Sequence, residues 1–118
     1  MEALYKILPA TLWATATDTV PWADVDTRDG FFHMSARAQL EETARRHFAG
    51  QTDLVVLAID PALLYPDTLR WEPSRGGALF PHVYGTVPRA AVIHVTHLDH
   101  VDADFTIASL EPREPGSA

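Results

Sequence analysis

The chain has 118 residues, 47% of them hydrophobic, and a formal net charge of −7, which is enough for one compact domain with a buried core. Its 16 acidic residues outnumber the 9 basic ones, and no basic stripe is present, which disfavours a protein that binds DNA or an anionic membrane through phosphate contacts. It has no cysteine, so disulfides, thiolate zinc sites and cysteine nucleophiles are excluded.

The apolar runs and the start of the chain bear on where the protein works. The longest apolar run, residues 54–59, is far too short to span a membrane. Residues 1–10 lack the basic start and the long apolar core of a signal peptide. We therefore expect a cytoplasmic protein with a single domain over residues 1–110 and a flexible tail over residues 111–118. Its oligomeric state is left open.

The first elements are short. Residues 3–8 (ALYKIL) predict a strand, and residues 11–16 predict a short helix that follows the turn at Pro9. Residues 18–30 (DTVPWADVDTRDG) contain Pro21, four Asp and Gly30 and predict a loop. Residues 31–34 predict a short apolar strand, and His33 lies near its end.

Residues 35–50 predict the clearest helix, with Ser35 as its N-cap and Gly50 at its end. Apolar and small residues recur at the helical spacing of one buried face. The members of that face are Leu40, Thr43, Ala44, His47 and Phe48. The other side carries charged pairs four residues apart, which are Arg37–Glu41, Glu41–Arg45 and Glu42–Arg46.

Strands dominate the second half. Residues 54–59 (LVVLAI) predict a central strand covered on both faces. Residues 69–72, 80–85 and 87–95 predict further extended segments, and residues 105–108 predict a last one. The order indicates an α+β fold with mixed or antiparallel sheets and two short flanking helices.

Four groups of residues could carry chemistry: His33, the pair Arg70 and Glu72, the pair His82 and Tyr84, and the loop of residues 73–77 with Arg75. Each has a purely structural alternative. His33 can be a hydrogen-bonded histidine at a strand end, and Arg70 with Glu72 can be a solvated ion pair. The Gly-Gly loop lacks the spacing of a phosphate-binding motif.

A metal site is not expected. His94, His97 and His100 are three residues apart on a predicted strand, where that spacing turns successive side chains to opposite faces.

The motifs DGFFHMS (29–35), LRWEPSRGG (69–77) and FPHVYG (80–85), together with YKI (5–7), closely resemble a small bacterial family known as domain of unknown function 952. The resemblance covers about residues 4–95. Ala36 departs from it, because the family places a Thr after the Ser. The resemblance implies a fold similar to that of ADP-ribosyltransferases, with two small sheets around a cleft that holds NAD in active members.

That resemblance also implies roles for the candidate residues. Glu72 and His33 would be catalytic, with Glu72 facing His33 across the cleft and holding a ribose hydroxyl beside an oxocarbenium-like state. The ligand contacts would come from His82, Tyr84, Arg70, Arg75 and Ser35, with an arginine on the pyrophosphate. NAD is then a possible substrate or bound nucleotide, and no other cofactor is expected. The alternative is a non-catalytic domain on the same fold that binds a small metabolite or a protein.

Overall fold

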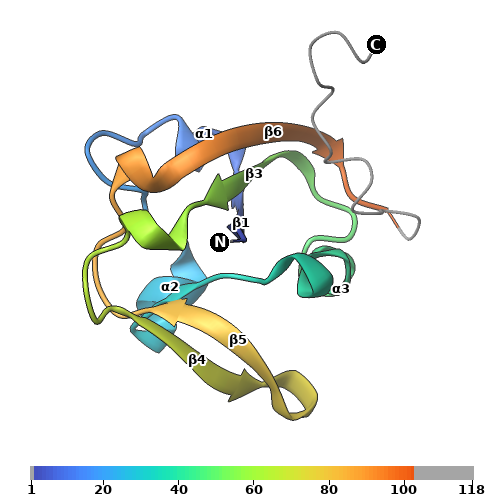
Figure 1. Ribbon diagram of the computed structural model, residues 1–118. Coiled ribbons are helices and arrows are strands. Elements are labelled where there is room, and N and C mark those ends of the chain that lie inside the picture. The colour runs from blue at the N-terminus through green and yellow to red at the C-terminus, as the bar shows by residue number, and fades with distance from the viewer. Residues whose placement is uncertain (1, 103–118) are drawn as a thin grey trace, which may run out of the picture.

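Two three-stranded sheets form the framework of the computed structural model, which describes residues 2–102 (Figure 1). Both sheets are antiparallel, so the expected α+β fold is confirmed and neither sheet is mixed. The first has the order β1-β3-β6 and the second the order β2-β5-β4. The strand bounds are β1 Leu4–Pro9, β2 Phe32–His33, β3 Thr52–Ile59, β4 Leu69–Ser74, β5 Ala78–Val83 and β6 Val92–His100.

Strand β3 is central in its sheet and covered on both faces, as its unbroken apolar sequence predicts. Val55 and Leu57 point into the larger core, which lies between the two sheets and includes Phe32 and Val83 of the second sheet. Leu54 and Val56 point the other way and pack with Leu40 and Ala44 of the long helix. The register of β3 therefore positions both layers of the molecule.

Three α-helices join the strands: α1 Ala10–Trp13, α2 Asp24–Asp29 and α3 Arg37–His47. Single 3-10 turns occupy Pro61–Leu63, Arg75–Gly77 and Arg89–Ala91, so β6 begins later than the strand predicted over residues 87–95. Helix α2 lies inside the predicted loop of residues 18–30 and raises the number of flanking helices above the expected two.

Helix α2 forms without an apolar stripe because one carboxylate organises it. Asp26 is fully buried, and its Oδ2 accepts a hydrogen bond from the Ala23 backbone N–H at 2.9 Å. Gly30 ends the helix at φ +85° and donates its N–H to the Asp26 carbonyl. Only glycine adopts this left-handed conformation at little cost, and it turns the chain back toward β2.

The start of α3 differs from the prediction. Ala36, not Ser35, is the N-cap residue, and its N–H donates to Gln39 Oε1 at 2.9 Å. The Ser35 side chain is buried and its hydroxyl donates to Thr43 Oγ1 at 3.0 Å, so the predicted cap is wrong. The Gln39 amide thus satisfies the N–H of the N-cap residue, and the Gln39 N–H donates to the Ala36 carbonyl at 2.9 Å.

The body of α3 follows its pattern more closely. Leu40 and Ala44 are fully buried, whereas His47 is exposed, so its predicted place on the buried face is wrong. The helix ends at His47, and the next residue, Phe48, is partly buried against the same core. Arg45–Glu41 and Arg46–Glu42 form the expected ion pairs, each at 2.9 Å.

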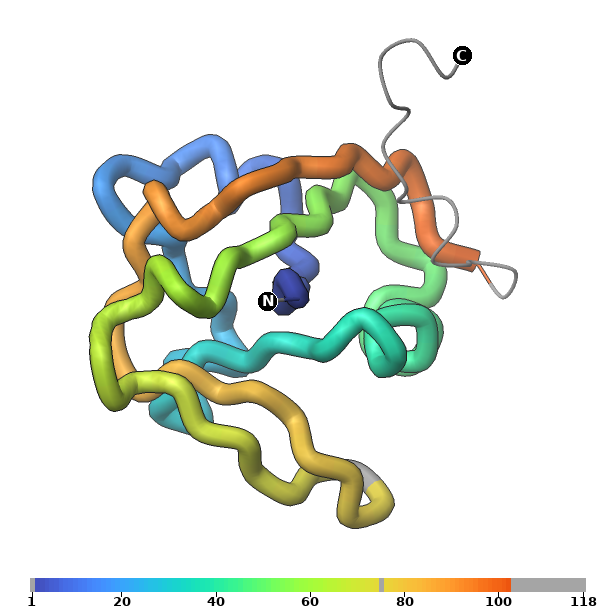
Figure 2. Tube along the Cα trace, viewed as in Figure 1, coloured from blue at the N-terminus to red at the C-terminus, as the bar shows by residue number. Residues whose placement is uncertain are grey.

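One end of the second sheet packs into the core, and the other end projects from it. Phe32 of β2 pairs with Val83 of β5, and both are fully buried. Beyond them, the hairpin of β4 and β5 extends away from the first sheet (Figures 1 and 2). Trp71 and Leu79 of this hairpin are about half exposed, at 47% and 51%.

Among residues 2–102, no helix has the length and apolar character needed to cross a membrane. The predicted strand at residues 105–108 and the predicted tail at residues 111–118 lie outside the described residues.

Candidate functional site

The pairing of the second sheet brings most of the predicted site residues together. His33 of β2 lies directly opposite His82 of β5, which lies opposite Arg70 of β4. Directly opposed residues of antiparallel strands share a face, as do residues two apart on one strand. Glu72 and Tyr84 therefore join the same face. Phe32 and Val83 occupy the other face, so this group points away from the core.

Glu72 is the centre of one half of the group. Its Oε1 accepts hydrogen bonds from His82 Nδ1 at 2.8 Å and from the Tyr84 hydroxyl at 2.7 Å. These two donors, His82 first, hold the pKa of Glu72 below its ordinary value, and the hydrogen bond to Glu72 raises the pKa of Tyr84. Within the described residues, every hydrogen bond to this carboxylate ends on Oε1.

His33 is the centre of the other half and lies between two carboxylates. Its Nδ1 is 2.7 Å from Asp26 Oδ1, and its Nε2 is 3.0 Å from Asp29 Oδ2. The backbone N–H of His33 also donates to Asp26 Oδ1 at 3.0 Å. The ring is therefore fixed in orientation from both sides by helix α2.

A buried lysine completes this half. Lys6 Nζ donates to both oxygens of Asp26, at 2.8 and 2.7 Å, and only 5% of its side chain is exposed. Burial raises the pKa of Asp26, but the hydrogen bond from His33 and the charge of Lys6 outweigh burial and lower it overall. Burial lowers the pKa of Lys6 against the opposing effect of Asp26.

Aromatic rings join the two halves. The Phe31 ring stacks on His82 with centroids 4.1 Å apart and an interplanar angle of 20°. It also contacts His33 at 4.4 Å and Tyr84 at 5.2 Å, and the two imidazoles meet edge to face at 5.4 Å. Phe31 thus covers His82, of which only 4% is exposed.

The structure corrects the expected arrangement of His33 and Glu72. They do not face each other across a cleft between two sheets, because both lie on one face of one sheet with His82 between them. Ser35 is not part of the group, since it is bound between β1 and α3. Arg70 is, with its guanidinium 5.5 Å from the Tyr84 ring. Arg75 lies at the hairpin tip, and its side chain is outside the described part of the structure.

Four residues of the group were missed from the sequence: Lys6, Asp26, Asp29 and Phe31. A signal existed for Lys6, because it alternates with Leu4 and Leu8 on the inward face of β1 and is the one lysine of the chain. No comparable signal marked Asp26, which is one of four aspartates in a segment with turn composition. Its role depends on contacts with residues 20 positions away.

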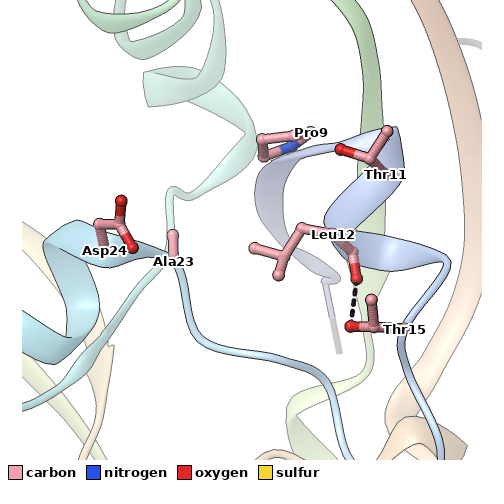
Figure 3. Close-up of a pocket in the computed structure, with 6 residues that line it drawn as sticks. All are labelled: Pro9, Thr11, Leu12, Thr15, Ala23 and Asp24. Atoms are coloured by element: carbon pink, nitrogen blue, oxygen red, sulfur yellow. Dashed lines mark hydrogen bonds between the residues drawn. The ribbon is translucent and has the colours of Figure 1, made fainter.

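Other candidate sites are weaker. No group of metal-binding side chains occurs among the described residues. A surface depression of about 390 Å³ lies between α1 and the start of α2 (Figure 3). It is lined by Pro9, Thr11, Leu12, Thr15, Ala23 and Asp24. None of the predicted site residues lines it, and the Thr15 hydroxyl is bound to the Leu12 carbonyl at 2.7 Å.

Known proteins provide an independent comparison. A solved crystal structure of protein CC0527 from Caulobacter crescentus is 42% identical, covers 86% of this chain and 90% of its own, and superposes with a TM-score of 0.78. The solution NMR structure of the same protein gives 42% identity, 88% and 90% coverage, and a TM-score of 0.71. No protein with curated annotation matches the chain. The family model described as "Protein of unknown function (DUF952)" matches residues 7–95, and the chain therefore belongs to this family.

Proposed function

We propose that the outer face of the second sheet binds a nucleotide of the NAD or ADP-ribose type, on a fold related to that of the ADP-ribosyltransferases. The observation that carries this proposal is the hydrogen bonding of the Glu72 carboxylate. Its Oε1 is held by His82 and Tyr84, while Oε2 is open among the described residues. A carboxylate oxygen held in this way is a suitable acceptor for a ribose hydroxyl.

The surroundings of Glu72 suit the rest of such a ligand. The partly exposed ring of Phe31 and the exposed ring of Tyr84 offer aromatic surface for a base or a nicotinamide ring. Arg70, packed over Tyr84, adds a positively charged guanidinium beside this aromatic surface. The two small antiparallel sheets agree with the related fold, although many functions share one fold.

The same geometry suits cleavage of the nicotinamide–ribose bond. In that reaction the C–N bond breaks with its electron pair on nicotinamide, and an acceptor oxygen bonds to the ribose carbon and gives its proton to a base. The Glu72 carboxylate would stabilise the positive charge that develops on the ribose. His33 and His82 would act by keeping the ligand and Glu72 in place.

A second candidate is a non-catalytic binding domain on the same fold. The observation that favours it is that both imidazoles are already engaged by other parts of the protein. Both ring nitrogens of His33 face carboxylates, and His82 is almost fully covered by Phe31. In this alternative the histidines hold the sheet and its helix together, and only Glu72, Tyr84 and Arg70 meet a ligand.

A thermal-shift titration with NAD, ADP-ribose and nicotinamide tests the proposal. Ligand at a hundred times its dissociation constant stabilises the native state by about 2.7 kcal/mol, a shift of several degrees for a domain of this size. We expect the shift to be lost in Glu72→Gln and kept in Glu42→Gln, which removes the same charge from the exposed face of α3.

Absence of a shift with all three compounds at millimolar concentration would contradict the proposal. If ADP-ribose binds but no nicotinamide is released from NAD, the non-catalytic candidate is favoured. If Glu72→Gln unfolds at a much lower temperature than Glu42→Gln, Glu72 is primarily structural.

A further inference from the structure

The carboxylate of Asp29 bridges a guanidinium and an imidazole at the edge of the aromatic cluster. Its Oδ2 lies 3.0 Å from His33 Nε2 and accepts a hydrogen bond from Arg28 Nη2 at 3.2 Å. Its Oδ1 accepts a second hydrogen bond, from Arg28 Nε at 2.9 Å. An oxyanion is thus held between a guanidinium and an imidazole, which is also how proteins hold phosphate groups.

We propose that Arg28 and His33 form an anion subsite, and that a phosphate-type oxyanion of the ligand replaces the Asp29 carboxylate there.

The two carboxylates that contact His33 differ in how firmly the protein holds them. Asp26 is fully buried and accepts hydrogen bonds from Lys6, His33 and the Ala23 backbone. Asp29 is partly exposed, with 31% of its side chain accessible, and its partner Arg28 is 72% exposed. Exposed ion pairs contribute little net free energy. Asp29 is therefore the partner that a ligand can displace, while Asp26 keeps the ring in place.

The charges of this network suit the exchange of one anion for another at Arg28. The hydrogen bond from Arg28 first, and then the charges of Arg28 and His33, hold the pKa of Asp29 below its ordinary value, and Asp26 also has a lowered pKa. Lys6 and Arg28 match the negative charges of Asp26 and Asp29 one for one, so an anion that displaces Asp29 meets the charge of Arg28.

The subsite lies beside the proposed nucleotide face. Gly30 and Phe31 directly follow Asp29, and the Phe31 ring covers His82. Identifying the oxyanion with the pyrophosphate of the nucleotide rests on the proposed function, whereas the anion subsite itself does not. In this arrangement the pyrophosphate binds Arg28 of α2, and Arg70 remains packed over Tyr84.

An NMR titration with inorganic pyrophosphate, at constant ionic strength, tests the subsite through the ring signals of His33. Asp29→Asn removes the competing carboxylate but keeps its shape, and we expect pyrophosphate to bind about two- to fivefold more tightly, as expected for loss of an exposed ion pair. Asp24→Asn is the matched control, since it makes the same charge change at an exposed position of the same helix. An equal gain in both variants, or no His33 response in any protein, would overturn the proposal.

Three arginine variants test where the anion binds. We expect Arg28→Gln to weaken pyrophosphate binding, and Arg45→Gln, which breaks an exposed ion pair of α3, to leave it unchanged. Weakening by Arg70→Gln and not by Arg28→Gln would overturn the assignment. Acetate at the same ionic strength should compete poorly, and equal competition would contradict the phosphate class. If pyrophosphate binds as expected but ADP-ribose does not displace it, the subsite stands and the proposed function fails.

Discussion

Two histidine–carboxylate pairs lie next to each other on the second sheet and differ mainly in their burial. His33 Nδ1 is 2.7 Å from Asp26, and His82 Nδ1 is 2.8 Å from Glu72. In the first pair the carboxylate is buried and the imidazole is partly exposed, at 29%. In the second pair the imidazole is buried and the carboxylate is 35% exposed. The same hydrogen bond thus presents an imidazole to solvent in one pair and a carboxylate in the other.

This inversion decides what each pair can do. Asp26 has all its acceptor capacity taken by Lys6, His33 and the Ala23 backbone, so it can only support the fold and orient His33. Within residues 2–102, the hydrogen bonds to Glu72 end on Oε1, and the buried His82 orients the carboxylate from behind. Chemistry at this surface depends on which member of the pair is buried, and not on the pair alone.

The largest expected effect is at the buried pair. Asp26→Asn leaves the Lys6 ammonium buried without its counter-charge, and breaking a buried pair in this way costs about 3–5 kcal/mol of unfolding free energy. For a chain of this size that lowers Tm by roughly 10 °C or more. Urea and thermal unfolding measure it, with Asp24→Asn as the control on the same helix. Equal stabilities of the two variants would show that Lys6 and Asp26 do not support the fold.

A smaller effect is expected from acid, which should lower the free energy of unfolding to a different extent through each pair. The folded-state pKa of Asp26 lies below its ordinary value of 3.8. Its contribution to stability is therefore fully present above that ordinary value and is lost as the pH falls through the folded-state pKa. We expect the loss of stability below about pH 4 to be reduced in Asp26→Asn more than in Glu72→Gln, because Asp26 accepts hydrogen bonds from more donors, Lys6 among them. Urea unfolding at pH 5 and pH 3 checks this ordering, and the reverse ordering would contradict it.

The smallest expected effect concerns the pair of His82 and Glu72 alone. Tyr84→Phe removes one of the two hydrogen bonds on Glu72 Oε1 but leaves His82 in place. We expect ADP-ribose affinity to fall by about two- to fivefold, as for the loss of one hydrogen bond, with little change in Tm. Calorimetric titration measures it, and Tyr65→Phe, at another exposed tyrosine, serves as control. An unchanged affinity would remove Tyr84 from the proposed site.

Much of this arrangement could be predicted from local pattern. The apolar run of β3 and the spacing of Leu40 and Ala44 in α3 indicated the core, because burial follows the period of each element. His33, Glu72, His82 and Tyr84 were also selected from their motifs. Their arrangement was not predictable, since the register that aligns β2, β5 and β4 is a property of long-range pairing.

Helix α2 shows where local reasoning stops. Its sequence, DVDTRD, has no apolar periodicity and only Arg28 as a strong helix former, so it is typical of a turn. The helix exists because Lys6 and His33 meet Asp26 from two different strands. Contacts of this kind override local propensity, and the anion subsite and the orientation of His33 depend on them.

The most direct test of the nucleotide-binding proposal is a backbone amide NMR titration of the full chain with ADP-ribose. The proposal predicts that the largest chemical-shift changes fall on residues 31–33, 70–72 and 82–84, which carry both histidines, Glu72, Tyr84 and the ring of Phe31. Changes confined to the depression around Thr11, Thr15 and Asp24, or no changes at millimolar ADP-ribose, would contradict it.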